Sequence, residues 1–152
     1  MIKKICFILI FFYSSQSFAN DNLNGTYVYC NNPEFTAWKS GFEFLGPSTD
    51  EGYNNLIEYN INLNTEGLAE SQRWYIAYFD YISIFSYNYI EDKIWLWGEF
   101  DRNTLGYKNI INDEYSNSGK VCSVMDSKEE LINKMISEFE NDKTTLKKKR
   151  KI

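Results

Sequence analysis

Short aromatic-rich segments alternate with turn-forming residues along this chain, and this pattern restricts its fold more than any other feature of the sequence. Aromatic residues make up 18% of the chain, and such side chains favour β-strands, which Asn, Asp and Gly interrupt. Turn signals recur about every ten to fifteen residues, which suits antiparallel hairpins better than crossover helices. We therefore expect a mainly β fold, an antiparallel barrel or sandwich of about seven or eight strands. The expected strands cover residues 25–30, 41–45, 55–62, 72–79, 81–89, 93–100, 105–109 and 120–125.

Two of these segments indicate how side chains divide between the faces of a sheet. Residues 57–62 alternate apolar and polar side chains, so the two kinds point to opposite faces. Residues 93–97 are apolar on both faces. A strand of this second kind is either central in a sandwich or faces the core on one side and a ligand, partner or helix on the other.

The carboxyl-terminal part of the chain changes to a helical period. Apolar residues recur there at three-to-four spacing, which predicts an amphipathic helix over about residues 127–142. A capping box marks its start, in which the Ser127 oxygen accepts from the Glu130 amide and the Glu130 side chain returns to the cap amide. We expect this helix to cover one mouth or an outer face of the sheet, and residues 143–152 to form a frayed basic tail. The apolar face consists of Leu131, Ile132, Met135, Ile136 and Phe139.

Residues 1–19 have the pattern of a cleavable secretory signal. Lys3 and Lys4 precede an apolar run and a small-polar stretch that ends at Ala19, which predicts cleavage before Asn20. The apolar run is about nine residues long, whereas a membrane-spanning helix needs roughly twenty. No later stretch is long or apolar enough to span, so we expect an exported, periplasmic or secreted domain over residues 20–142 without a transmembrane segment.

Two cysteines remain after this cleavage. Cys6 leaves with the signal, and in an oxidising compartment Cys30 and Cys122 are expected to form one disulfide. Such a bridge would hold the strand that leads into the helix against the first strand. The alternative is two separate buried thiols.

The charge of the chain bears on its partners. The full sequence has a net charge of −5, and loss of two lysines with the signal makes the body more acidic. An acidic body repels nucleic acid and favours a cationic protein partner. The basic run at residues 147–151 is the exception, because it could touch an anionic surface. Candidate contacts for a cationic partner are Glu91, Asp92, Glu99 and Asp101.

The sequence contains little that points to catalysis. It has no histidine, which excludes imidazole bases, histidine metal ligands and Ser-His pairs. Pairing of the two cysteines would also exclude thiolate catalysis and zinc-thiolate sites. No calcium loop or glycine-rich phosphate loop is present, so we expect no metal, cofactor or nucleotide. The remaining enzymatic alternative is a carboxylate-dependent hydrolase of envelope glycan.

The tryptophans and tyrosines are the best candidates for binding, because they offer rigid contact area with a polar tip. Both indoles of Trp95-x-Trp97 project from one strand face, and Tyr87-x-Tyr89 has the same spacing. We expect a non-enzymatic binding protein that takes a small apolar or aromatic ligand on an aromatic-rich sheet face. The alternative is an inhibitor or immunity protein that neutralises a cationic enzyme or toxin. The candidate binding residues are Trp74, Tyr87, Tyr89, Trp95 and Trp97.

Residues 23–27, Leu-Asn-Gly-Thr-Tyr, match the pattern L-x-G-x-[WY]. This segment resembles the start of the first strand in lipocalin-like barrels, with Tyr27 where lipocalins usually carry Trp. The resemblance implies an antiparallel barrel that binds a ligand or partner at its interior or rim. It also implies structural roles for Gly25, which would allow the bend into the barrel, and for Tyr27, which would plug its base.

Overall fold

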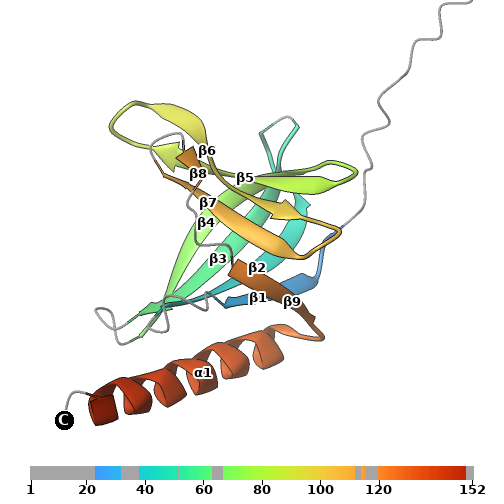
Figure 1. The fold of residues 1–152 in the computed structure, drawn as a ribbon. Coiled ribbons are helices and arrows are strands. Elements are labelled where there is room, and N and C mark those ends of the chain that lie inside the picture. The colour runs from blue at the N-terminus through green and yellow to red at the C-terminus, as the bar shows by residue number, and fades with distance from the viewer. Residues whose placement is uncertain are drawn as a thin grey trace, which may run out of the picture.

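The computed structural model describes residues 23–31, 38–50, 52–62, 67–111, 114–115 and 120–149. The expected signal peptide and its cleavage site before Asn20 lie outside these residues, as do residues 150–152 of the expected basic tail. Figure 1 shows a β-barrel with a long helix on its outer surface. Among the described residues, no helix is both long enough and apolar enough to cross a membrane.

The expected mainly β fold is confirmed, and its form is a closed barrel. Each of the first seven strands pairs antiparallel with the next along the chain. Strand β9 then lies between β7 and β1, which closes a ring of strands, while the short β8 pairs with β7. The strands are β1 (Thr26–Asn31), β2 (Trp38–Pro47), β3 (Asn54–Asn62), β4 (Leu68–Ala77), β5 (Tyr81–Asn88), β6 (Lys93–Asp101), β7 (Gly106–Ile111), β8 (Glu114–Tyr115) and β9 (Lys120–Met125).

A disulfide secures the closing strand. Cys30 of β1 and Cys122 of β9 stand directly opposite each other in the ladder, and the predicted bridge joins them across 92 residues of sequence. Both cysteines are buried among the inward-facing side chains. On its other side, the described part of β9 pairs with β7 at two positions, Gly106 with Val121 and Tyr107 with Lys120. The closing strand is therefore held mainly through β1.

Aromatic side chains fill one part of the barrel interior. The Phe42 and Phe100 rings meet edge to face with centroids 5.0 Å apart, and Phe44 meets Tyr75 at the same distance. These geometries are the ones that aromatic pairs favour. Other inward residues complete this core, namely Val28, Leu56, Ala77, Ile82, Ile84 and Tyr107.

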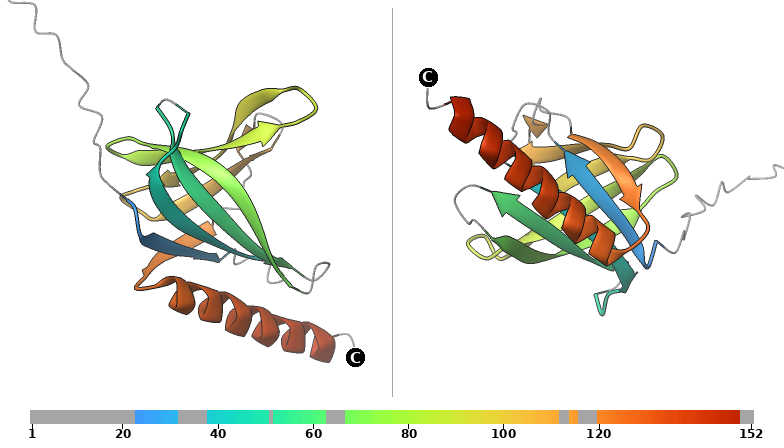
Figure 2. Two further views of the ribbon diagram at one scale, coloured as in Figure 1. Left: turned by 180° about the vertical axis from the view of Figure 1, so that it is seen from behind. Right: turned by 90° about the horizontal axis from the view of Figure 1, so that it is seen from below.

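Helix α1 (Lys128–Lys149) packs on the outer face of β1, β2 and β3, as Figures 1 and 2 show. Its apolar face buries Leu131, Met135 and Phe139 in a second cluster outside the barrel, together with Tyr29, Tyr59 and Ile61. The predicted amphipathic helix and its position on an outer face are therefore confirmed. The helix approaches β2 so closely that a Cβ at Gly41 would lie 2.6 Å from the Met135 sulfur and 2.8 Å from a Leu131 methyl carbon.

The ends of the helix differ in detail from the prediction. The Glu130 amide donates to Ser127 Oγ at 3.1 Å, as expected, but the Glu130 carboxylate accepts from the Asp126 amide at 2.7 Å and not from the cap amide. The helix also continues to Lys149, past the expected end at about residue 142. An ion pair of 2.6 Å between Lys39 and Asp142 holds this distal part against the barrel.

The position of Tyr27 differs from the one that the lipocalin-like resemblance implies. Gly25 has a φ of +81°, in the region that favours glycine, and lies at the turn into β1. Tyr27 does not plug the base of the barrel, because it packs in the outer cluster beneath α1. The strand alternation explains this placement, since Val28 and Cys30 face inward. Leu23 packs against the interior core instead.

Replacing Gly41 with alanine is expected to lower the free energy of unfolding by about 1–3 kcal/mol, because the added methyl would overlap Met135 and Leu131. Urea unfolding followed by circular dichroism measures this change. Gly46→Ala is the matched control in the same strand, since the nearest atom to a Cβ there is Asn24 Nδ2 at 3.8 Å. Equal stability of the two variants would contradict the close approach of α1 to β2.

Candidate functional site

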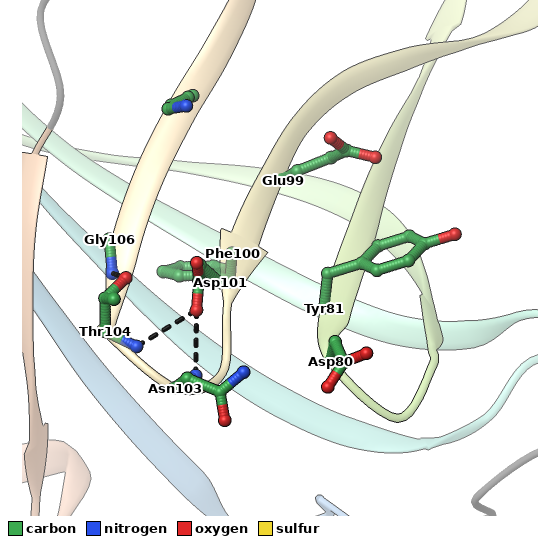
Figure 3. Close-up of a pocket in the computed structure, with 9 residues that line it drawn as sticks. Asp80, Tyr81, Glu99, Phe100, Asp101, Asn103, Thr104 and Gly106 are labelled. Carbon is green, nitrogen blue, oxygen red and sulfur yellow. Dashed lines mark hydrogen bonds between the residues drawn. The ribbon is translucent and has the colours of Figure 1, made fainter.

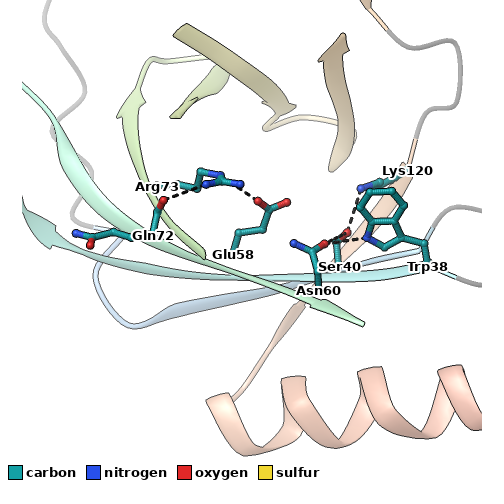
Figure 4. A network of polar contacts seen from close by, with 7 residues as sticks. All are labelled: Trp38, Ser40, Glu58, Asn60, Gln72, Arg73 and Lys120. Carbon is teal, nitrogen blue, oxygen red and sulfur yellow. Dashed lines mark hydrogen bonds and ion pairs between the residues drawn. The ribbon is translucent and has the colours of Figure 1, made fainter. Parts of the chain in front are cut away.

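Strand β3 directs polar side chains into the barrel. The predicted alternation at residues 57–62 is present, with Ile57, Tyr59 and Ile61 in the cluster beneath α1. Glu58 and Asn60 therefore point to the opposite face, which is the barrel interior. Figure 4 shows both on the side of the sheet away from the helix. Within residues 57–62, the polar side of the strand, not the apolar side, faces the inside of the barrel.

An ion pair lies within this interior. Glu58 is 2% exposed, and one of its carboxylate oxygens lies 3.1 Å from Arg73 Nε on the neighbouring strand β4. The Arg73 guanidinium carbon stands 4.8 Å from the centre of the Trp97 ring. The aromatic ring and the carboxylate together stabilise this partly buried cation.

A second group of polar contacts begins at Lys120 of β9. Its amine donates to Ser40 Oγ at 3.0 Å, and that hydroxyl donates to Asn60 Oδ1 at 3.1 Å. Asn60 Oδ1 also accepts from Trp38 Nε1 at 2.9 Å, as Figure 4 shows. The Lys120 amine stands 5.1 Å from the centre of the Tyr107 ring and 5.6 Å from that of Trp38. Burial lowers the pKa of Lys120 from 10.5 to about 8, although the negative charge of Glu58 acts in the opposite direction.

Two hydrogen-bond donors in the interior have no partner among the described residues. They are the buried Trp97 Nε1 and the Tyr107 hydroxyl, which belongs to a fully buried side chain. The hydroxyl packs against Gly98, where a Cβ would lie 2.5 Å from it. Burial raises the pKa of Tyr107 well above its ordinary value, so the hydroxyl keeps its proton. We call the set Trp38, Ser40, Glu58, Asn60, Arg73, Trp97, Tyr107 and Lys120 the interior polar cluster.

The structure divides the five aromatic residues expected to share one binding face. Trp97 packs against the interior core. The centres of the Trp95 and Trp97 rings are 5.7 Å apart, and Trp95 pairs with the buried Ser86 of β5. Trp74 and Tyr87 belong to the outer face, because each directly adjoins an inward residue on its strand. Tyr89, in the β5–β6 turn, is 88% exposed.

A β-bulge accounts for the position of Trp97. Ile84 pairs with Gly98 but the next residue, Phe85, pairs with Leu96, so β6 has one extra residue at Trp97. Because of the extra residue, the side chains of β6 before and after the bulge alternate between the two faces of the sheet in different phase relative to β5. The sequence contains no local sign of this change.

The four acidic residues expected to contact a cationic partner lie in two places. Glu99 and Asp101 line an open groove of about 530 Å³, together with Asp80 (Figure 3). Glu91 and Asp92 lie in the turn before β6, at its other end. Backbone amides of Thr104 and Asn103 donate to Asp101 and lower its pKa. Within the described part of the chain, no three Cys, Asp or Glu side chains are grouped so as to hold a metal ion.

Sequence reasoning missed most of the interior polar cluster. The alternation at residues 57–62 could have indicated Glu58 and Asn60 as one face, but it did not indicate that this face is inside the barrel. Ser40, Arg73 and Lys120 belong to three other strands and follow no motif. Only the sheet pairing shows that these residues meet.

Lys120→Met is expected to stabilise the protein at pH 7 by up to roughly 3 kcal/mol, because the folded state then no longer buries a charged amine. The pKa of Lys120 is lower in the folded state than when unfolded, so the unfolded state binds more protons between about pH 8 and 10.5. The free energy of unfolding of the unaltered protein therefore rises across this pH window. As it rises, the stability advantage of Lys120→Met disappears. Urea unfolding at several pH values measures it, with the exposed Lys147→Met as control. A difference that does not change with pH would contradict the burial of this amine.

Comparison of the chain with protein-family models, with curated proteins and with solved structures gives no match. The functional interpretation of this barrel therefore rests on its own residues. The interior polar cluster is the strongest candidate for a functional site. Its charged groups, and its donors that have no partner among the described residues, face the inside of the barrel.

Proposed function

We propose that this chain is an exported, non-enzymatic binding protein whose ligand enters the barrel and contacts the interior polar cluster. The observation that carries the proposal is the presence of two buried donors that have no hydrogen-bond partner among the described residues, Trp97 Nε1 and the Tyr107 hydroxyl, in the same interior as the partly buried amine of Lys120. A buried polar group without a hydrogen bond is destabilising, and a bound ligand would remove that penalty.

The form of the barrel supports this proposal. An eight-stranded barrel has an interior that side chains can fill or that can hold one small ligand. Here the apolar core occupies only part of the interior, and the polar cluster lies toward the end where β2 and β9 begin. Trp38, the first residue of β2, is 48% exposed and stands at the rim of this end. The polar end would therefore be the entrance.

The aromatic residues of the interior support the proposal of an organic small-molecule ligand. Trp97, one of the residues singled out from the sequence, contributes its ring and its free donor to the interior. Trp38 and Tyr107 add further ring surface around the Lys120 amine. Aromatic walls with a few polar groups are typical of small-molecule sites.

Native mass spectrometry on unreduced protein, purified from the exported fraction, tests the proposal. We expect a small-molecule adduct on the unaltered protein, and a loss of at least tenfold in its occupancy in Asn60→Leu, which removes an interior acceptor. Gln72→Leu is the control, because this exposed side chain is on the outer face of the adjacent strand β4. Circular dichroism verifies that both variants keep the fold. Absence of any adduct, or its retention in Asn60→Leu, would contradict an interior site.

A second candidate function is inhibition of a cationic enzyme or toxin, and the acidic groove of Asp80, Glu99 and Asp101 favours it. The same experiment distinguishes the two. If the adduct is a basic polypeptide that dissociates with salt, and if Glu99→Lys and Asp101→Lys abolish it, the groove is the site. Glu91→Lys is the control, since it makes the same charge change at the other end of β6.

A further inference from the structure

We propose that the ligand of the barrel is an organic carboxylate whose carboxylate group lies beside Lys120, with Trp97 and Tyr107 as further donors. This inference rests on the proposed function and names the class of ligand. Three observations support it, namely the charge of the interior polar cluster, its unpartnered donors and its aromatic surfaces.

The first observation is an unbalanced charge. The interior polar cluster contains two cations, Arg73 and Lys120, and one carboxylate, Glu58. Glu58 is paired with Arg73 at 3.1 Å, whereas no ion pair joins Lys120 to a carboxylate among the described residues. Buried charges are normally paired. One bound monoanion would therefore make the number of negative charges in the interior polar cluster equal to the number of positive charges.

The groups that face Lys120 among the described residues do not supply the missing charge. Ser40 and Trp38 of β2 offer a neutral hydroxyl and a ring, and Tyr107 of β7 offers a ring. Glu58 of β3 acts on Lys120 only through its field. None of these contacts replaces a full negative charge next to the amine.

The second observation is an excess of donors. A lysine ammonium has three donors, and Lys120 directs one of them to Ser40. The indole N–H of Trp97 can only donate, and the Tyr107 hydroxyl keeps its proton as a donor. An ionised carboxylate only accepts, so it complements this set, whereas an amine would place donors against donors.

The third observation separates an organic acid from an inorganic anion. The Lys120 amine stands 5.6 Å from the Trp38 ring centre and 5.1 Å from that of Tyr107, and the Trp97 ring packs against the apolar core. These surfaces suit an apolar or aromatic body attached to the carboxylate. Inorganic phosphate or sulfate would leave them without a partner.

Binding of this kind depends on pH in a direction that the structure sets. The pKa of Lys120 in the free protein is about 8, so the amine is charged at pH 7 and largely neutral at pH 9. The interaction with a carboxylate requires the charged form. Affinity should therefore be about tenfold weaker at pH 9 than at pH 7.

Nuclear magnetic resonance of the ¹⁵N-labelled exported protein tests the inference, because each indole N–H gives its own signal. Benzoate is the probe, and benzamide is its neutral analogue of the same shape. At pH 7 we expect benzoate to move the Trp97 indole signal saturably, with benzamide at least tenfold weaker and the outer-face Trp74 signal unchanged. Trp97→Phe assigns the signal. The response should disappear in Lys120→Met and persist in the exposed control Lys147→Met.

The other outcomes are distinct. An equal response to benzamide, or to inorganic phosphate, would overturn the organic carboxylate but leave an interior site in place. A benzoate response that survives in Lys120→Met, or that is equally strong at pH 9, would overturn the role of this amine. If neither probe moves the Trp97 signal, the inference is wrong, and the native adduct then decides whether the proposed function stands without it.

Discussion

The packing of α1 against β1, β2 and β3 is the contact on which the rest of the structure depends. Tyr59 and Ile61 of β3 are buried outside the barrel with Leu131, Met135 and Phe139 of the helix. Side chains alternate along a strand, so the placement of Tyr59 outside directs Glu58 and Asn60 inside. The helix thus determines the polarity of the barrel interior as well as covering its surface.

The disulfide contributes to the same site by a different route. Cys122 and Lys120 share the inward face of β9, because they are two residues apart in the strand. The bridge to Cys30 aligns β9 with β1, while the contact of β9 with β7 is short. The covalent link that closes the barrel therefore also positions the Lys120 amine among residues from β2, β3 and β7.

The surface and the interior of this protein have opposite electrostatic character. The chain as a whole has a net charge of −5, which favours cationic partners at long range. The interior polar cluster contains one more cation than it has carboxylates, and this favours an anion at short range. The net charge of the chain therefore does not describe the charge of the barrel interior.

The local pattern of the sequence determined the elements of this protein. Aromatic segments between turn residues produced the strands, the three-to-four spacing after Ser127 produced the helix, and the two cysteines outside residues 1–19 form the bridge. Alternation along a strand is a local property, which is why the opposite faces of residues 57–62 were also predictable. Only the tertiary structure decided which of those faces is inside, because that depends on the side of the sheet that the helix covers. It likewise decided the inward position of Trp97 and the meeting of Arg73 with Glu58 and of Lys120 with Ser40, since bulges and contacts between distant strands have no local signature.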